Sequence, residues 1–179
     1  EKGVIMLYPV LTSSRLVSDL SGIWDFKLDN GSGFEEKWYE KPLEEALTMP
    51  VPASYNDLKE GASFRDHYGW VFYQRSISVP AYVRQAQRVV LRCDAVTHHA
   101  RVFLNGKEIC EHRGGFLPFE VEIGSRTNLY THKRRILQLR IVGGIGQERQ
   151  KRDCQNKSIS FHYLNFVIRS IELLSPLGS

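Results

Sequence analysis

The sequence has few cysteines, no long apolar run and little excess charge of either sign. Its three cysteines, Cys93, Cys110 and Cys154, form no C-x-x-C pair. This pattern indicates neither a disulfide framework nor a zinc cage, so reduced thiols are expected. No stretch reaches the roughly 18 apolar residues that span a bilayer, and residues 1–10 lack the apolar core of a signal peptide. We therefore expect no membrane segment and a cytoplasmic protein.

Charge is nearly balanced along the chain. Lys and Arg total 24 and Asp and Glu total 20, which leaves a formal net charge of +4. Cations cluster only at 133–135 and 149–152, where a hydrated loop is the ordinary interpretation. A nucleic-acid-binding protein usually gathers its cations on one face. Binding to DNA or RNA is therefore a minor alternative, and no nucleic-acid partner is expected.

The size and composition are those of one ordinary globular domain. The chain has 179 residues, of which 42% are hydrophobic and 25% are charged. A chain of this length can bury a core without metal or disulfides. We predict a single domain over residues 1–179.

Short β-strands are the dominant local signal. Apolar and polar residues alternate, or β-branched residues gather, in segments 70–79, 88–93, 100–104, 107–110, 119–123, 136–142 and 166–174. Asn105-Gly106 can adopt a type I′ turn and predicts a hairpin over 100–111. Helical signals are confined to one or two turns at 33–39, 42–47 and 56–59. The pattern predicts an all-β antiparallel sandwich of the jelly-roll type, with 143–158 as a long loop.

The residue pattern predicts no catalytic group, metal site or cofactor. The adjacent acids Glu35/Glu36 and Glu44/Glu45 diverge on any regular backbone and indicate solvated surface. Asp57 and Asp66 lie in loops and could meet across the fold, but no spacing brings them together. The six histidines form no metal-binding spacing, and His98 and His99 are expected as neighbours on one strand.

Other motifs for chemistry are incomplete. Ser54 and Cys93 lie in no nucleophile motif. The glycines of 143–146 lack the Lys-Ser/Thr of a phosphate loop and indicate a flexible loop start. Six aromatic residues in or beside loops could stack on sugar rings, although each alone is more often core: Tyr55, Phe64, Tyr68, Trp70, Phe116 and Tyr163.

Five ordered motifs resemble a known domain. They are Leu-Ser-Gly-Ile-Trp-Asp-Phe at 20–26, Pro-Ala-Ser-Tyr-Asn-Asp at 52–57, Gly-Trp-Val-Phe-Tyr-Gln-Arg at 69–75, Asp-Ala-Val-Thr-His at 94–98, and His-Arg-Gly-Gly-Phe-Leu-Pro-Phe at 112–119. They resemble the N-terminal sugar-binding jelly roll, galactose-binding-like in fold, of glycoside hydrolase family 2. Within that family they resemble the β-glucuronidase branch. The resemblance runs from about residue 6 to 120 and less clearly to 174.

The resemblance implies a supporting role. In such enzymes the two catalytic glutamates lie on a C-terminal TIM barrel reached through a central immunoglobulin-like domain, and this chain contains neither domain. It implies that the jelly roll packs on the barrel, shapes the pocket for β-glucuronides and contributes to a homo-oligomer. A stand-alone carbohydrate-binding module or lectin is the alternative.

The resemblance also assigns residues. It implies a structural role for a set of motif residues: Trp24, Asn56, Asp57, Trp70, Tyr73, Arg75, Asn105, Gly106, Gly114, Gly115, Pro118 and Phe119. It places His162, Tyr163 and Asn165 at the rim of the substrate pocket. The family's run there carries an Asp that reaches towards glucuronate, but Tyr163 stands in its place. That contact is therefore not carried over to this chain.

Overall fold

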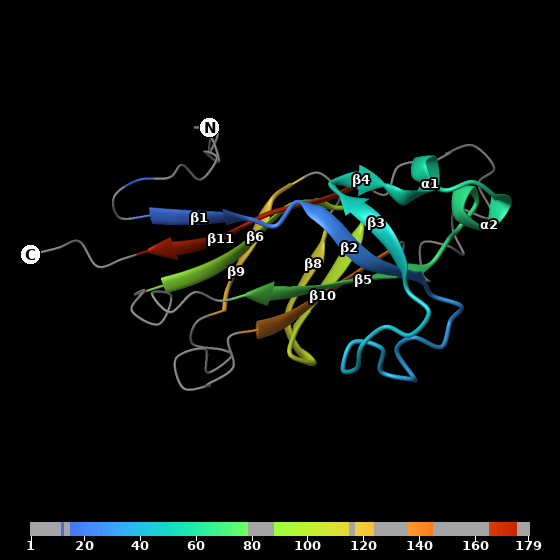
Figure 1. Cartoon of the computed structure of the whole chain (residues 1–179), viewed down its shortest axis with the longest axis horizontal. Coiled ribbons are helices and arrows are strands. Elements are labelled where there is room, and N and C mark those ends of the chain that lie inside the picture. Colours follow the sequence, from blue (N-terminus) through green and yellow to red (C-terminus); the bar gives the residue numbers. More distant parts are fainter. Residues whose placement is uncertain are drawn as a thin grey trace, which may run out of the picture.

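Two antiparallel β-sheets pack face to face in this protein (Figure 1). The computed structural model describes residues 12, 15–78, 88–114, 117–123, 136–144 and 165–174, and in the last range only the backbone. Every strand pair is antiparallel. The all-β sandwich predicted from the alternating segments is confirmed.

The five-stranded sheet joins the two ends of the described chain. Its order is β1-β11-β6-β9, and the short β4 pairs with the start of β11. The bounds are Arg15–Asp19 for β1, Ala53–Ser54 for β4, Arg88–Val96 for β6, Phe119–Glu122 for β9 and Asn165–Leu174 for β11. The first and last strands are therefore neighbours, as Figure 1 shows in blue and red.

The six-stranded sheet has the order β3-β2-β5-β10-β7-β8. Its bounds are Gly22–Leu28 for β2, Leu47–Val51 for β3, Trp70–Ser78 for β5, His99–Leu104 for β7, Lys107–Arg113 for β8 and Ile136–Gly144 for β10. Strands β5 and β10 lie at its centre and pair over nine residues each.

Asn105 and Gly106 form the predicted hairpin turn between β7 and β8. Their φ angles are 51° and 82°, the positive values that a type I′ turn requires. The turn is also fixed to the neighbouring strand β10. The Asn105 amide donates to the Gln138 carbonyl at 2.9 Å, and the Gln138 amide donates to Asn105 Oδ1 at 3.0 Å.

The helices are two single turns, α1 (Tyr55–Leu58) and α2 (Ala62–Arg65). The turn expected at 56–59 is therefore present, but the helical turns expected at 33–39 and 42–47 are wrong. Lys37 and Glu45 there have φ values of 53° and 52°, which end any right-handed helix. Neither described helix is long and apolar enough to cross a membrane.

Gly143 and Gly144 do not start a flexible loop. Both belong to β10, opposite Val71 and Trp70 of β5. A Cβ atom on Gly144 would lie 2.3 Å from the Gly69 carbonyl oxygen. The glycine is required by this close approach of two backbones, and residues 145–158 lie outside the described residues.

His98 and His99 do not lie on one strand, as the sequence had suggested. Strand β6 ends at Val96 and β7 begins at His99, with a cis peptide between Thr97 and His98 at the bend. The His98 carbonyl accepts a hydrogen bond of 2.7 Å from the Gly114 amide. This contact ties the start of β7 to the residue that follows β8.

The main core fills the space between the sheets. Trp24, Phe26 and Tyr73 are at most 1% exposed, and Phe26 packs against the Tyr73 ring at 5.0 Å. A second cluster lies on the opposite face of the six-stranded sheet, because Phe72, Phe103 and Val142 alternate with core residues along their strands. Residues 34–43 cover this cluster.

Candidate functional site

One of the three predicted pocket-rim residues, Asn165, lies at one end of the sandwich, where β4 and α1 meet the start of β11. The backbone of Asn165 pairs with Ser54, and Phe166 pairs with both Ala53 and Val96. Asn165 therefore stands at the edge formed by the 52–57 motif. Its side chain lies outside the described residues, as do His162 and Tyr163.

Asn56 joins the two short helices at this end. Its Nδ2 donates to the Phe64 carbonyl at 2.8 Å and to the Arg65 carbonyl at 3.4 Å. The side chain thus holds a local loop in place of regular secondary structure. Asp57 is exposed in the first turn of α1, and Asp66 forms an exposed ion pair with Arg65 at 3.3 Å. These contacts do not bring the two aspartates together as a catalytic pair.

The hydroxyl and thiol groups near this end are poor reactants. Tyr55 and Tyr73 are fully buried, and burial raises the pKa of both phenols. Burial likewise raises the pKa of the Cys93 thiol, so the thiolate is suppressed at neutral pH. None of the three is activated as a nucleophile or a general acid.

The histidines at this end make separate contacts. His67 Nε2 lies 3.2 Å from the Trp70 carbonyl, and burial lowers the pKa of His67 although that contact raises it. The His112 ring stacks on Phe119 at 4.4 Å. His99 Nε2 lies 2.7 Å from Glu111 Oε1. Among the described residues, no three His, Cys, Asp or Glu side chains gather as a metal site.

Only some of the six aromatic residues suggested as sugar contacts are known to face solvent. Tyr55 is buried, and Phe64 packs partly against the core. Trp70 is half-buried and meets Phe34 edge to face at 5.3 Å. Tyr68 keeps 48% of its surface exposed and is the described residue of this set best placed to meet a sugar face. Phe116 and Tyr163 lie outside the described residues.

Trp24 and Arg75 form hydrogen bonds with the backbone just before β2. Trp24 Nε1 donates to the Leu20 carbonyl at 3.0 Å, and the Arg75 guanidinium donates to the Leu20 and Ser21 carbonyls at 2.5 and 3.0 Å. A Cβ on Gly22 would lie 3.4 Å from that guanidinium, and Gly22 has a φ of 131°. These contacts fix the backbone beside a core tryptophan.

Close contacts of the His112 ring also link the end of β8 with the start of β9. Gly114 has a φ of 144°, and a Cβ there would meet His112 Nε2 at 3.4 Å. Pro118 is half-buried and Phe119 is buried beneath the His112 ring. Gly115, the remaining residue of this motif set, lies outside the described residues.

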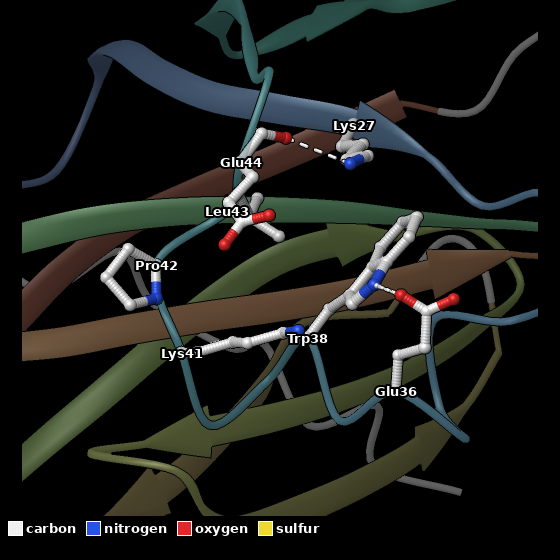
Figure 2. Close-up of a pocket in the computed structure, with 7 residues that line it drawn as sticks. All are labelled: Lys27, Glu36, Trp38, Lys41, Pro42, Leu43 and Glu44. Carbon is white, nitrogen blue, oxygen red and sulfur yellow. Dashed lines mark hydrogen bonds between the residues drawn. The ribbon is translucent and has the colours of Figure 1, made fainter.

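A small cavity lies on the face covered by residues 34–43 (Figure 2). It is lined by Lys27, Glu36, Trp38, Lys41, Pro42, Leu43 and Glu44 and holds about 40 Å³. Such a volume fits a water molecule, whereas small-molecule sites enclose roughly 300 to 1,000 Å³. Hydrogen bonds from Ser32 and Trp38 lower the pKa of Glu36. The carboxyl therefore stays ionised, which does not suit a general acid.

Comparisons with known proteins agree on one family. A sequence model described as "Glycosyl hydrolases family 2, sugar binding domain" matches residues 17–137. β-Glucuronidase of Paenibacillus borealis is 48% identical over 119 residues, which cover 66% of this chain and 20% of that protein. The mouse β-glucuronidase is 42% identical over 127 residues with the same coverage.

Solved structures show the same likeness. β-Glucuronidase of an uncultured Clostridium sp. superposes with a TM-score of 0.75 at 36% identity, covering 95% of this chain and 31% of that one. The Ruminococcus gnavus β-glucuronidase in complex with D-glucuronic acid gives 0.68 at 31% identity, covering 77% and 23%. The chain spans about a fifth of the curated relatives. From the matched motifs and the shared sandwich, this chain belongs to glycosyl hydrolase family 2, as its sugar-binding domain.

Proposed function

We propose that the polypeptide to which this domain belongs hydrolyses β-D-glucuronides with retention of configuration. The chemistry would reside outside the 179 residues. The observation that carries the proposal is the coverage: the fold matches β-glucuronidases over 95% of this chain but over only 31% of the solved relative. The relatives' activity is thus associated with a chain several times longer.

The acidic side chains of the described part agree with a supporting role. Retaining glycosidases need two carboxyl groups about 5 Å apart in one cleft. Here Glu108 is paired with Arg101, Glu111 with His99, and Glu120 with Arg92. Glu36 and Glu44 line a space that holds only about 40 Å³, which is too small for a sugar.

The domain would serve the pocket through the end that carries β4, α1 and the start of β11. That end combines the position of Asn165 with the exposed ring of Tyr68. We infer that it packs on the catalytic barrel and forms one wall of the pocket, while other surfaces serve contacts in a homo-oligomer.

The test uses the complete reading frame from which this chain derives. The purified protein should cleave p-nitrophenyl β-D-glucuronide in strong preference to the matching β-D-galactoside and β-D-mannoside. In that protein Asn165→Ala should raise KM for the glucuronide, because it alters the pocket rim. Thr48→Ala, an exposed change on the edge strand β3, serves as the matched control. A preference for a neutral sugar would overturn the proposal.

A further inference from the structure

Arg140 is buried at the centre of the six-stranded sheet, on the face away from the main core. It is 3% exposed, and its neighbours along β10, Leu139 and Ile141, point into the core. Its Nε donates to Gln74 Oε1 at 2.9 Å. The same oxygen also accepts a hydrogen bond of 3.3 Å from the Leu43 amide. The single bonding partner of Arg140 in the described part is therefore a neutral oxygen that it shares.

Strand register keeps carboxylates away from this guanidinium. Across the sheet the row runs Asp25, Gln74, Arg140, Phe103 and Glu108. Each acid is two strands from Arg140, which is about 10 Å at the spacing of a β-sheet. Both carboxylate oxygens of Glu108 also already accept hydrogen bonds from the Arg101 guanidinium. The described residues therefore give Arg140 no ion pair.

The remaining donors of Arg140 define what would satisfy them. An arginine stays protonated in a protein and presents five N–H donors, of which the contact with Gln74 uses one. Burial lowers the pKa of Arg140, and no charge among the described residues counters that effect. The two terminal nitrogens match the two oxygens of a carboxylate in parallel, which is the strongest pairing open to a guanidinium. A fold that keeps such a charge buried is more stable once an anion is supplied.

Part of the same face, beside this position, is open to solvent. Residues 34–43 cover one part of the face, but Ser76 is exposed and Gln138 is half-buried one step further along β5 and β10. Gln138 Nε2 donates to Ser76 Oγ at 2.8 Å, so this polar pair borders Arg140 on the open side. We propose that the Arg140 guanidinium is a binding site for a carboxylate group on the outer face of the six-stranded sheet. This site does not depend on the hydrolytic function proposed above.

The test measures formate binding to the 179-residue chain. Formate replaces chloride at constant ionic strength while the Arg Nε–Hε NMR signals and the Tm are followed. The Arg140 signal should shift and the Tm should rise with formate. In Arg140→Gln the apparent Kd for formate should weaken by about tenfold or more. Arg101→Gln removes a guanidinium from the neighbouring strand of the same face and should keep the response of the unmodified chain.

A second arm identifies the source of the carboxylate. If an acidic side chain of another copy fills the site, the unmodified chain self-associates in sedimentation equilibrium and Arg140→Gln is monomeric. Either a formate response or this association, lost in Arg140→Gln, supports the site. The proposal is overturned if formate leaves the Arg140 signal unmoved and both proteins have the same mass. The NMR measurement on the unmodified chain decides the formate arm even if the variant does not fold.

Discussion

Arg92 and Arg140 are equally buried, at 3% exposure, but they differ in the hydrogen-bond partners that their sheets provide. In the five-stranded sheet Arg92 donates to Asp94 Oδ1 at 2.9 Å and to Glu120 Oε1 at 2.7 Å. Burial opposes its charge, but these two acids outweigh it and raise the pKa of Arg92. Within the described part of the chain, Arg140 has only the Gln74 amide oxygen. One arginine is therefore satisfied within the fold, whereas the guanidinium of the other is available to a group from outside.

The largest effect should follow from removing Arg92. Arg92→Met removes the guanidinium that pairs with Asp94 and Glu120, and breaking a buried pair in this way costs about 3 to 5 kcal/mol. Urea denaturation should show that loss in the free energy of unfolding. Arg88→Met is the matched control, because Arg88 pairs with Glu122 at the surface and such pairs contribute at most about 1 kcal/mol. Equal losses in both variants would refute the distinction between them.

The two acids around Arg92 should differ from each other. The Asp94 side chain is 10% exposed and the Glu120 side chain is 39% exposed. Asp94→Asn should therefore cost about 2 kcal/mol, as expected for a buried charged hydrogen bond. Glu120→Gln should cost about 1 kcal/mol or less, because water screens that contact. The same denaturation series measures both, and a reversed order would show that burial does not set these energies.

Replacing Arg140 should have the opposite sign. Arg140→Met removes a buried charge that has no ion pair among the described residues and fills the space with apolar atoms. Its free energy of unfolding should lie between no change and a gain of about 2 kcal/mol. Thermal and urea unfolding in chloride buffer give this value. A loss as large as that of Arg92→Met would mean that Arg140 stabilises the isolated domain through contacts of its own.

The smallest expected effect is on the pH dependence of stability, and it comes from a histidine, whose side chain can lose its proton near neutral pH. Burial lowers the pKa of His112, so the folded state favours the neutral ring. The unfolded chain then binds more protons, and the stability present above its pKa of about 6.5 is lost as pH falls through the lower folded value. Unfolding measured from pH 7 down to 5 should show this loss. His112→Phe should flatten the slope, whereas Arg140→Met should leave it unchanged because arginine does not titrate there.

Short-range sequence patterns made the second half of the fold predictable. The Asn105-Gly106 turn is encoded by two residues that tolerate positive φ, and β9 and β10 alternate regularly. The first half lacks that clarity. In β2 the apolar Ile23 is 61% exposed beside the buried Trp24, so apolar residues do not mark one face. Strand β3 contains Pro50, which is tolerated at a sheet edge but weakens the strand signal.

The candidate site depends on contacts between distant segments. The motif at 52–57 is recognisable in the sequence, but its position beside Asn165 follows only from the pairing of β4 with β11. The need for Gly144 arises from the carbonyl of Gly69. In the same way, the isolation of Arg140 follows from the register of five strands, which no pattern along one strand reveals. These contacts depend on long-range strand pairing, which local sequence patterns do not encode.

The supporting, non-catalytic role of this domain is tested most directly by a turnover assay of the 179-residue chain by itself on p-nitrophenyl β-D-glucuronide. The product of the complete reading frame serves as the positive control. We expect release of p-nitrophenol by the complete protein and none above buffer by the isolated domain. Enzymatic turnover by the isolated domain, abolished by changing one of its own acids, would contradict it.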